Sequence, residues 1–348
     1  MTLPKLMSGV VLTAHGGPET LKWGDDLPVP EPSAGEVLIK VSAAGVNNTD
    51  INTRTAWYSK RGAKAQDATW SGSPISFPRI QGIDACGVIA AVGEGVSAQR
   101  VEERVLVEPC LLEADAKTLD TPWFFGSECD GAFAQYTRVA ARHAYLIDSD
   151  LSDVELASFP CSYSTAENML TRAGVSAGET VLITGASGGV GSAAVQLARA
   201  RGATVIAVTN AAKSEAIREL GASRTLLRTD NYVSELGAKS VDVVIDLVAG
   251  EKFSALLDVL DTGGRYAVAG AVAGPLVELD IRTLYLKDLS FFGCTVLEPE
   301  VFGSLINLIE TSKIKPLVAD TFALRDIDAA QRAFAEKGYV GKIVLKVG

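Results

Sequence analysis

Three glycines between an apolar run and a helical pattern are the strongest chemical signal in this 348-residue sequence. In VLITGASGGVG the glycines have the spacing G-x-x-G-x-x-G. Glycine lets the backbone turn sharply and approach a pyrophosphate closely, and the free N–H groups at the start of the helix attract that anion. The pattern therefore predicts a dinucleotide-binding βαβ unit. The residues expected at the cofactor are Gly185, Ser187, Gly188, Gly189, Val190 and Gly191.

The end of the next strand pattern, VIAVTN, bears on the choice between the two nicotinamide dinucleotides. An NAD site usually has Asp or Glu there, about 20 residues after the glycines, to bind the ribose hydroxyls. Here the strand ends in Thr209 and Asn210, with Lys213 just beyond, and Arg228 follows the next strand pattern. One charge pair at 4 Å is worth about 4 kcal/mol at an effective dielectric near 20. We therefore expect NADP, although both cations are also compatible with ordinary surface positions.

Cysteine and histidine usage argues against a metal centre. The five cysteines are widely spaced without a C-x-x-C pair, and neither histidine lies near another plausible ligand in sequence. This arrangement favours free thiols over a disulfide framework and lacks the clusters that hold zinc. The residues concerned are Cys86, Cys110, Cys129, Cys161, Cys294, His15 and His143.

Two regions with different secondary-structure patterns must position these residues. From about residue 9 to 140, short β-type runs are broken by Gly and Pro, which predicts a mostly antiparallel β domain. From about residue 152, strand and helix patterns alternate, which predicts a parallel doubly wound sheet. The last segment supplies two helices and a closing strand that fit either domain. The polar stretch from Ala56 to Phe77 is long enough to be functional or disordered.

Composition excludes several functional classes. A hydrophobic share of 47% with 21% charged residues indicates a globular protein. A formal net charge of -10 disfavours nucleic-acid binding, which depends on cations against phosphate. The sequence shows neither a secretory leader pattern nor an apolar run of 18 residues, so we expect a soluble, cytoplasmic protein without membrane partners.

Six motifs follow one another along the chain. In order, they are AAGVNNTDINTR, GIDACGVIAAVGEGV, DGAFAQYTRV, CSYSTA, GASGGVG and GYVGKIVLKV. With them the chain resembles the medium-chain dehydrogenase/reductase superfamily over nearly its whole length, and within it the zinc-independent quinone oxidoreductase branch that includes zeta-crystallin. The resemblance implies an α/β Rossmann domain, residues 156–302, inserted into a GroES-like, mostly-β catalytic domain. The catalytic domain would comprise residues 1–155 and be completed by residues 303–348.

Zinc-dependent members of that superfamily place a Cys, a His and a later Cys or Asp at three ligand positions. In this chain the first position holds Asn47, the second Ile83, and the third Cys161. One ligand of three does not hold a catalytic zinc, which needs three protein donors and an open fourth site. We therefore expect no metal.

The resemblance also implies which residues face the reaction. Asn47 and Tyr58 are the candidates for positioning the acceptor or the nicotinamide, the alternatives being a loop-bracing amide and an aromatic side chain packed in the rim. Asp50 and Asp84 are interpreted as structural, because carboxylates beside tight turns often cap backbone N–H groups. Further residues expected along the cofactor are Thr165, Val248, Gly270, Phe292, Gly293 and Lys342. The segments RYAVAGAV and LSFFGCTV resemble those that pair relatives into homodimers.

Loss of the metal changes the expected chemistry. Alcohol oxidation loses its Lewis acid, whereas hydride addition to a quinone or enone puts negative charge on an oxygen that hydrogen-bond donors can stabilise. The sequence predicts an NADPH-dependent reductase of quinones or α,β-unsaturated carbonyls, acting on a small-molecule substrate by direct hydride transfer. The alternatives are an alcohol or aldehyde dehydrogenase with a different metal set, and an NADPH-binding protein without turnover.

Overall fold

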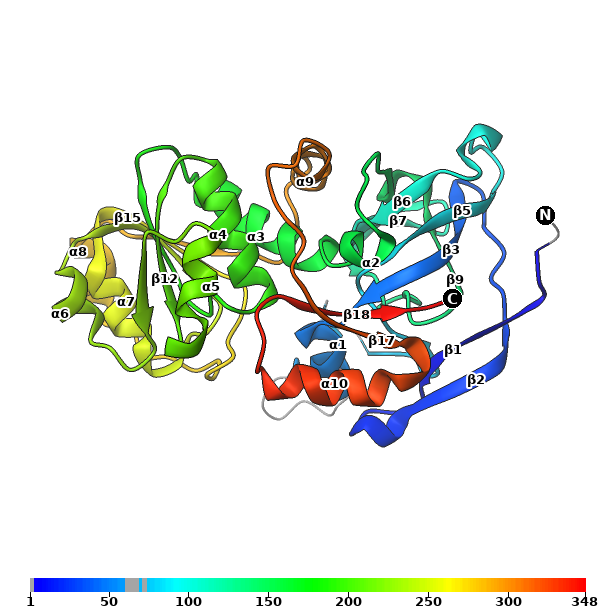
Figure 1. Cartoon of the computed structure of the whole chain (residues 1–348), viewed down its shortest axis with the longest axis horizontal. Coiled ribbons are helices and arrows are strands. Elements are labelled where there is room, and N and C mark those ends of the chain that lie inside the picture. Colours follow the sequence, from blue (N-terminus) through cyan, green and yellow to red (C-terminus); the bar gives the residue numbers. More distant parts are fainter. Residues whose placement is uncertain (1–2, 60–68, 71–73) are drawn as a thin grey trace. The chain divides into compact units, whose positions relative to one another are not determined.

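The computed structural model describes residues 3–59, 69–70 and 74–348, so the stretch from Ala56 to Phe77 lies partly outside the described residues. Its contacts divide the chain into two compact units, shown in Figure 1. The first unit comprises residues 1–161, 316–338 and 342–348, and the second comprises residues 162–315 and 339–341. The chain thus returns to the first unit after completing the second.

The first unit is built on two antiparallel-rich sheets. The larger has the order β10 (Ala144–Leu146), β6 (Arg104–Val107), β5 (Cys86–Val92), β3 (Glu36–Gly45), β18 (Lys342–Lys346) and β17 (Val318–Ala323), with β9 (Tyr136–Ala140) also paired to β3. The smaller has the order β2 (Leu21–Pro28), β1 (Leu6–Leu12) and β4 (Arg79–Ile80). A hairpin joins β7 (Cys110–Ala114) to β8 (Lys117–Phe124). Its helices are α1 (Asn48–Arg54), α2 (Asp153–Leu156) and α10 (Ile327–Glu336).

The central position of β3 explains why the closing strand matters. Strand β3 is buried over most of its length and pairs with β5 on one side and β18 on the other. Strand β18 pairs antiparallel to β3 with Val344 opposite Gly45, and the Val46 N–H donates to the Ile343 carbonyl at 2.9 Å. This register brings residue 342 beside residue 47.

The second unit is a parallel sheet with the order β13 (Arg224–Leu227), β12 (Thr204–Thr209), β11 (Thr180–Ile183), β14 (Val241–Asp246), β15 (Leu260–Val268) and β16 (Ser290–Gly293). Figure 1 shows helices on both faces of this sheet. The helices are α3 (Pro160–Arg172), which begins at the boundary of the units, α4 (Gly189–Ala200), α5 (Ser214–Glu219), α6 (Tyr232–Leu236), α7 (Phe253–Val259), α8 (Ile281–Leu286) and α9 (Val301–Glu310).

The apolar character of the inner strands follows from this architecture. In β11, the three residues Val181, Leu182 and Ile183 are fully buried, because helices cover both faces of a parallel sheet. Side chains of β12, β14 and β15 form one core with the apolar faces of α6 and α7. The order, with β11 at the centre, puts the glycine turn that follows β11 between β12 and β14.

The predicted fold class, a Rossmann sheet inserted into a GroES-like domain, is confirmed. The contact-based division falls after Cys161 and Lys315, whereas the domain limits drawn from the sequence lie at residues 155 and 302. Helix α9 consequently belongs to the second unit. In the described part of the chain, no helix has the length and apolar character needed to cross a membrane.

Candidate active site

A buried polar cluster lies in the first unit where β18, the turn before β5 and the start of α1 meet. The Lys342 Nζ atom lies 2.5 Å from the Asn47 Oδ1 atom and 2.8 Å from the Asp84 Oδ2 atom, and donates to both. The Asn47 Nδ2 group donates to the same Asp84 Oδ2 atom at 2.8 Å and to the Gly45 carbonyl at 3.3 Å. The side chains of Lys342 and Asp84 are 3% and 0% exposed, so this ion pair is shielded from water.

The hydrogen bonds of Asn47 fix the orientation of its side-chain amide. A primary amide has two N–H donors and one carbonyl acceptor. Asp84 and Gly45 accept from the Nδ2 group, and Lys342 donates to the Oδ1 atom. The amide is therefore fixed in orientation by its neighbours. This geometry favours Asn47 as a positioning residue. Such a role resembles the alternative considered from the sequence, in which the amide braces its loop.

The second buried carboxylate, Asp50, closes the first turn of α1. Its Oδ2 atom accepts from the Asn47 N–H at 2.8 Å, which confirms the capping role expected for it. Burial raises the pKa of Asp50 to about 7; the Asn47 N–H bond and the charge of Lys342 oppose the increase, and the nearby charge of Asp84 adds to it. The Gln81 Nε2 group donates to the Asp50 carbonyl at 2.9 Å and ties α1 to the segment before β5.

Tyr58 follows α1 and lies among aromatic rings. Its hydroxyl and the Thr49 hydroxyl form a hydrogen bond with 3.2 Å between the oxygens. Burial raises the pKa of Tyr58, so the phenol keeps its proton at neutral pH. The ring stacks on Trp70 with 6.1 Å between centroids and meets Trp57 edge-on at 5.4 Å. The structure thus supports both the functional and the packing interpretations of Tyr58.

The positions where zinc-dependent relatives have ligands are occupied differently in this chain. The Ile83 side chain is 2% exposed and belongs to the apolar core. Cys161 is buried, and its backbone N–H donates to the Asp84 Oδ1 atom at 2.6 Å. The Cys86 thiol is directed instead to Asp153, with 3.7 Å between sulfur and oxygen. Among the described residues, no three His, Cys, Asp or Glu side chains are grouped so that they could hold a metal ion.

The glycine turn of the second unit has the geometry expected for dinucleotide binding. Gly185 has a φ of +58°, in the left-handed region that favours glycine. A Cβ atom at Gly191 would lie 2.2 Å from the Gly185 carbonyl oxygen, so only glycine permits this approach of helix and strand. Helix α4 begins at Gly189 and directs free N–H groups out of its first turn. Ser187 and Val190 belong to the same turn.

The end of β12 brings together the residues expected at the 2'-phosphate. Thr209 pairs with Leu227, so Asn210 and Arg228 follow at the same edge of the sheet. Among the described residues the buried Thr209 Oγ1 atom has no hydrogen-bond partner, and the Asn210 Oδ1 atom accepts from the Lys213 N–H at 3.0 Å. Burial and the nearby charge of Arg228 lower the pKa of Lys213. Two cations close enough to affect each other, at the strand end that Thr209 forms, are an arrangement that fits a phosphate group.

Most of the other predicted cofactor residues lie at the same edge, because the carboxyl ends of parallel strands share one edge. Val248 follows β14, and its Cγ2 atom lies 3.2 Å from an ideal Cβ position at Gly185. Gly270 follows β15 and approaches the Leu247 carbonyl. Two more residues, Phe292 and Gly293, end the edge strand β16. The remaining two lie elsewhere. Thr165 is in α3, and the Lys342 ammonium group donates to Asn47 and Asp84 in the polar cluster of the first unit.

Sequence reasoning identified Asn47 and Lys342 separately but missed their contact. The available signal was the pairing of a closing strand with the strand before Asn47, which no local pattern specifies. It also missed Gln81, whose role depends on loop packing. The capping function of the two carboxylates was the part that residue type and spacing did indicate.

Two family models match the chain. A model described as an alcohol dehydrogenase GroES-like domain matches residues 33–149, and one described as a zinc-binding dehydrogenase matches residues 189–311. Together with the parallel sheet and its glycine turn, these matches define an oxidoreductase that uses NAD(P) and combines a GroES-like with a Rossmann domain.

Individual relatives agree over almost the entire chain. Quinone oxidoreductase of Lama guanicoe is 30% identical over 355 aligned residues, covering 98% of each chain, and acryloyl-coenzyme A reductase of Metallosphaera sedula is 30% identical over 352, covering 97% of this chain and 99% of its own. A candidate alcohol dehydrogenase of known structure from Sinorhizobium meliloti 1021 is 44% identical, with a TM-score of 0.91 and 99% and 98% coverage. The chain belongs to the medium-chain dehydrogenase/reductase superfamily.

Proposed function

We propose that this oxidoreductase uses NADPH to reduce quinones or α,β-unsaturated carbonyls by direct hydride transfer, without zinc. The observation that carries the proposal is the contact between Lys342 and Asn47. Asn47 stands at the first ligand position of the zinc-dependent relatives, and its side-chain oxygen accepts from a buried ammonium group 2.5 Å away. A fixed cation there opposes a divalent cation at the same place. The quinone oxidoreductases among the relatives support the same substrate class.

The preference for NADPH rests on the end of β12. Thr209, Lys213 and Arg228 would hold the 2'-phosphate, while the turn from Gly185 to Gly191 would hold the pyrophosphate. NADPH, when bound, supplies the hydride. The protein places no carboxylate at residues 209 and 210, where an NAD site would have one for the ribose hydroxyls.

Residues of the first unit would handle the charge and the proton on the acceptor. Reduction makes an acceptor oxygen more negative, and preorganised donors stabilise that charge. When the Tyr58 hydroxyl donates to Thr49, the Thr49 hydroxyl keeps its own proton to donate to the acceptor. The buried pair of Lys342 and Asp84 holds Asn47, and through its backbone N–H the start of α1, in one geometry. The cluster therefore positions this hydroxyl pair.

The experiment is to follow NADPH oxidation with a panel of quinones and enones, with NADH in parallel. We expect turnover with conjugated acceptors and a higher kcat/KM with NADPH. The 44% identity to a candidate alcohol dehydrogenase makes alcohol oxidation the rival activity. Activity with alcohols alone, abolished by a chelator, would contradict the proposal, and metal analysis of the purified protein provides an independent check. NADPH binding without any turnover would favour a non-catalytic role.

We further propose that the protein is a homodimer paired through β16. This edge strand is accompanied by exposed apolar side chains, and a monomer rarely leaves such an edge uncovered. The side chains, with their exposed fractions, are Val272 (71%), Ile281 (60%), Tyr285 (58%), Leu286 (68%) and Phe291 (38%).

A further inference from the structure

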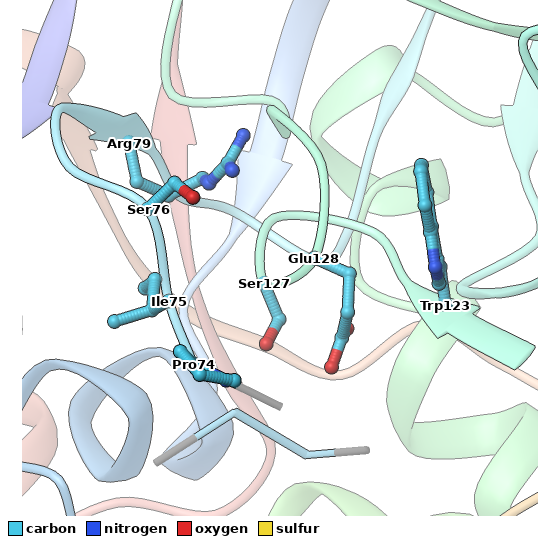
Figure 2. Close-up of a pocket in the computed structure, with 7 residues that line it drawn as sticks. All are labelled: Pro74, Ile75, Ser76, Arg79, Trp123, Ser127 and Glu128. Atoms are coloured by element: carbon cyan, nitrogen blue, oxygen red, sulfur yellow. The ribbon is translucent and has the colours of Figure 1, made fainter. Parts of the chain in front are cut away.

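A recess in the first unit is not used by any step proposed above. It has a volume of about 250 Å³. Figure 2 shows Ser127 and Glu128 extending from one turn, with Pro74 and Ile75 across from them. Because pockets for drug-sized ligands measure roughly 300–1,000 Å³, this recess suits a ligand no larger than one or two fused rings. The residues that line it are Pro74, Ile75, Ser76, Arg79, Trp123, Ser127 and Glu128.

Two donors at this recess have no hydrogen-bond partner among the residues that the structure describes. The Ser127 Oγ atom and the Arg79 Nε group are buried without a hydrogen bond, and the Ser127 residue is only 4% exposed. The Arg79 Nη1 group is engaged, since it donates to Asp130 at 2.8 Å. Leaving a buried donor unpaired costs free energy, and a ligand that accepts a hydrogen bond from it offsets that cost. Carbonyl oxygens accept such bonds without carrying a charge.

The charges around the recess disfavour an anionic ligand. Arg79 is the cation of the lining, and Asp130 already neutralises it. Glu128 adds a carboxylate to the lining, and its Oε2 atom accepts from the Phe124 N–H at 2.8 Å. One guanidinium against two carboxylates leaves the surroundings with a net negative charge. An uncharged ligand with carbonyl groups is therefore the better match.

The turn that carries Ser127 and Glu128 is fixed to the candidate active site by close backbone packing. A Cβ atom at Gly126 would lie 2.7 Å from the Gly82 nitrogen, and one at Gly131 would lie 2.4 Å from the Gly82 oxygen. The Ala132 N–H donates to the Gly82 carbonyl at 2.9 Å. Gly82 precedes Ile83 and Asp84, so this turn packs directly against the segment that carries a carboxylate of the polar cluster.

Stacked rings provide a second connection. Phe124 stacks on Trp70 with 4.2 Å between centroids, and Trp70 stacks on Tyr58 at 6.1 Å. Trp123, next to Phe124, lines the recess. Because Trp123 and Phe124 are consecutive in β8, their side chains lie on opposite faces of the strand. This strand therefore carries a recess residue on one face and a ring of the row that leads to Tyr58 on the other.

We propose that this recess recognises the electron acceptor, that it takes a planar, uncharged ring compound with carbonyl groups, such as a quinone, and that Ser127 and Glu128 determine this specificity. The proposal rests on the proposed reduction of quinones. Ser127 donates to a ligand carbonyl, Trp123 offers an aromatic surface to the ring, and Glu128 repels anionic acceptors.

The first test is Ser127→Ala with 2-methyl-1,4-naphthoquinone as the acceptor. We expect KM to rise about five- to tenfold, the loss of one hydrogen bond, while kcat stays unchanged. The thermal midpoint should stay the same or rise, because the hydroxyl removed has no hydrogen-bond partner in the described part of the chain. A purely structural role would instead lower the midpoint. Ser304→Ala, in α9 of the other unit, is the matched control and should change neither KM nor kcat.

The second test compares 2-methyl-1,4-naphthoquinone with 1,4-naphthoquinone-2-sulfonate in Glu128→Gln. Glutamine keeps an oxygen that accepts from Phe124 but removes the negative charge. We expect KM for the sulfonate to fall at least about fivefold relative to wild type, with KM for the uncharged quinone unchanged. Asp120→Asn removes an equal charge from the exposed side of β8 and should leave the preference as it is.

Failure of this proposal is separable from failure of the proposed reaction. If wild type reduces quinones and both variants keep every KM, the recess does not select the acceptor. If wild type reduces no quinone or enone, quenching of tryptophan fluorescence by 2-methyl-1,4-naphthoquinone gives the dissociation constant directly. Weaker quenching in Ser127→Ala then supports the binding site, and equal or absent quenching overturns it.

Discussion

In the polar cluster of the first unit, a few contacts decide which buried carboxylate is paired with a cation. Asp84 accepts from Lys342, from Asn47 and from the Cys161 backbone, so its charge is matched on both oxygens. Asp50 accepts backbone N–H groups, but among the described residues its carboxylate forms no ion pair with a cation. Residue type and spacing indicated that both carboxylates cap turns. Asp84 receives its ammonium group from Lys342, which lies 258 positions later, and spacing does not reveal that contact.

Lys342→Met is expected to destabilise the fold strongly, because it leaves Asp84 buried without its cation. Removing one partner of a buried ion pair costs about 3–5 kcal/mol. The double variant Lys342→Met with Asp84→Asn should recover part of that loss. Urea unfolding measures each difference, and Arg282→Met, which breaks an exposed pair with Asp280, is the control. A double variant as unstable as the sum of its parts would show that the two charges do not interact.

Asp50→Asn should change how stability depends on pH. In the folded protein the pKa of Asp50 is raised from 3.8 to about 7, so the unfolded chain loses this proton first as pH rises. The stability that the protonated form supplies is complete below pH 4 and is lost between pH 4 and 7. Relative to wild type, the variant should thus gain up to about 4 kcal/mol between pH 4 and 8. A stability difference between the two proteins that is independent of pH would contradict the raised pKa.

At the scale of elements, the parallel strands explain why the cofactor residues were the easier part to predict. Thr209 ends β12, and Val248 and Gly270 follow β14 and β15, yet all three lie at the edge that holds the glycine turn. Strand ends are visible as changes in hydrophobic pattern, so sequence locates them well. The recess beside Ser127 was not predictable, because loop residues form much of it and loop packing leaves no periodic signal. Within the polar stretch from Ala56 to Phe77, residues 60–68 and 71–73 lie outside the described residues.

Lys213→Glu should reverse the expected preference at the end of β12. A carboxylate near Arg228 would repel the 2'-phosphate and could bind the ribose hydroxyls of NAD instead. We expect the dissociation constant for NADPH to rise at least about tenfold and that for NADH to change little. Cofactor fluorescence titration measures both. Arg218→Glu, on the exposed face of α5, is the control, and an equal loss of both cofactors in Lys213→Glu would argue against phosphate recognition.

At the scale of the whole molecule, the fold class and the order of the domains were predictable, since alternation of strand and helix distinguishes the second unit from the first. Assembly is the property that depends on surface features. Two side chains that are 68% and 38% exposed, Leu286 and Phe291, lie on α8 and on the edge strand β16. Exposed apolar side chains at a strand edge indicate a contact surface.

The wild-type protein is expected to have twice the 36.5 kDa mass of one chain in solution, as determined by light scattering after gel filtration. Leu286→Lys combined with Phe291→Lys should shift the mass toward that of one chain, because two buried lysines would meet their symmetry mates. Leu146→Lys, at an exposed apolar residue of the first unit, should leave the mass unchanged. A wild-type protein with the mass of one chain would rule out the homodimer.

Strand β18 also imposes an order on biosynthesis. A ribosome completes the entire second unit before it adds Lys342, so a nascent first unit holds Asp84 without its counter-ion and β3 without its pairing to β18. The first 161 residues alone should therefore remain open to proteolysis while the Rossmann unit folds, and Asn47 gains its final geometry after translation has passed residue 342. The catalytic half, although begun first, matures last.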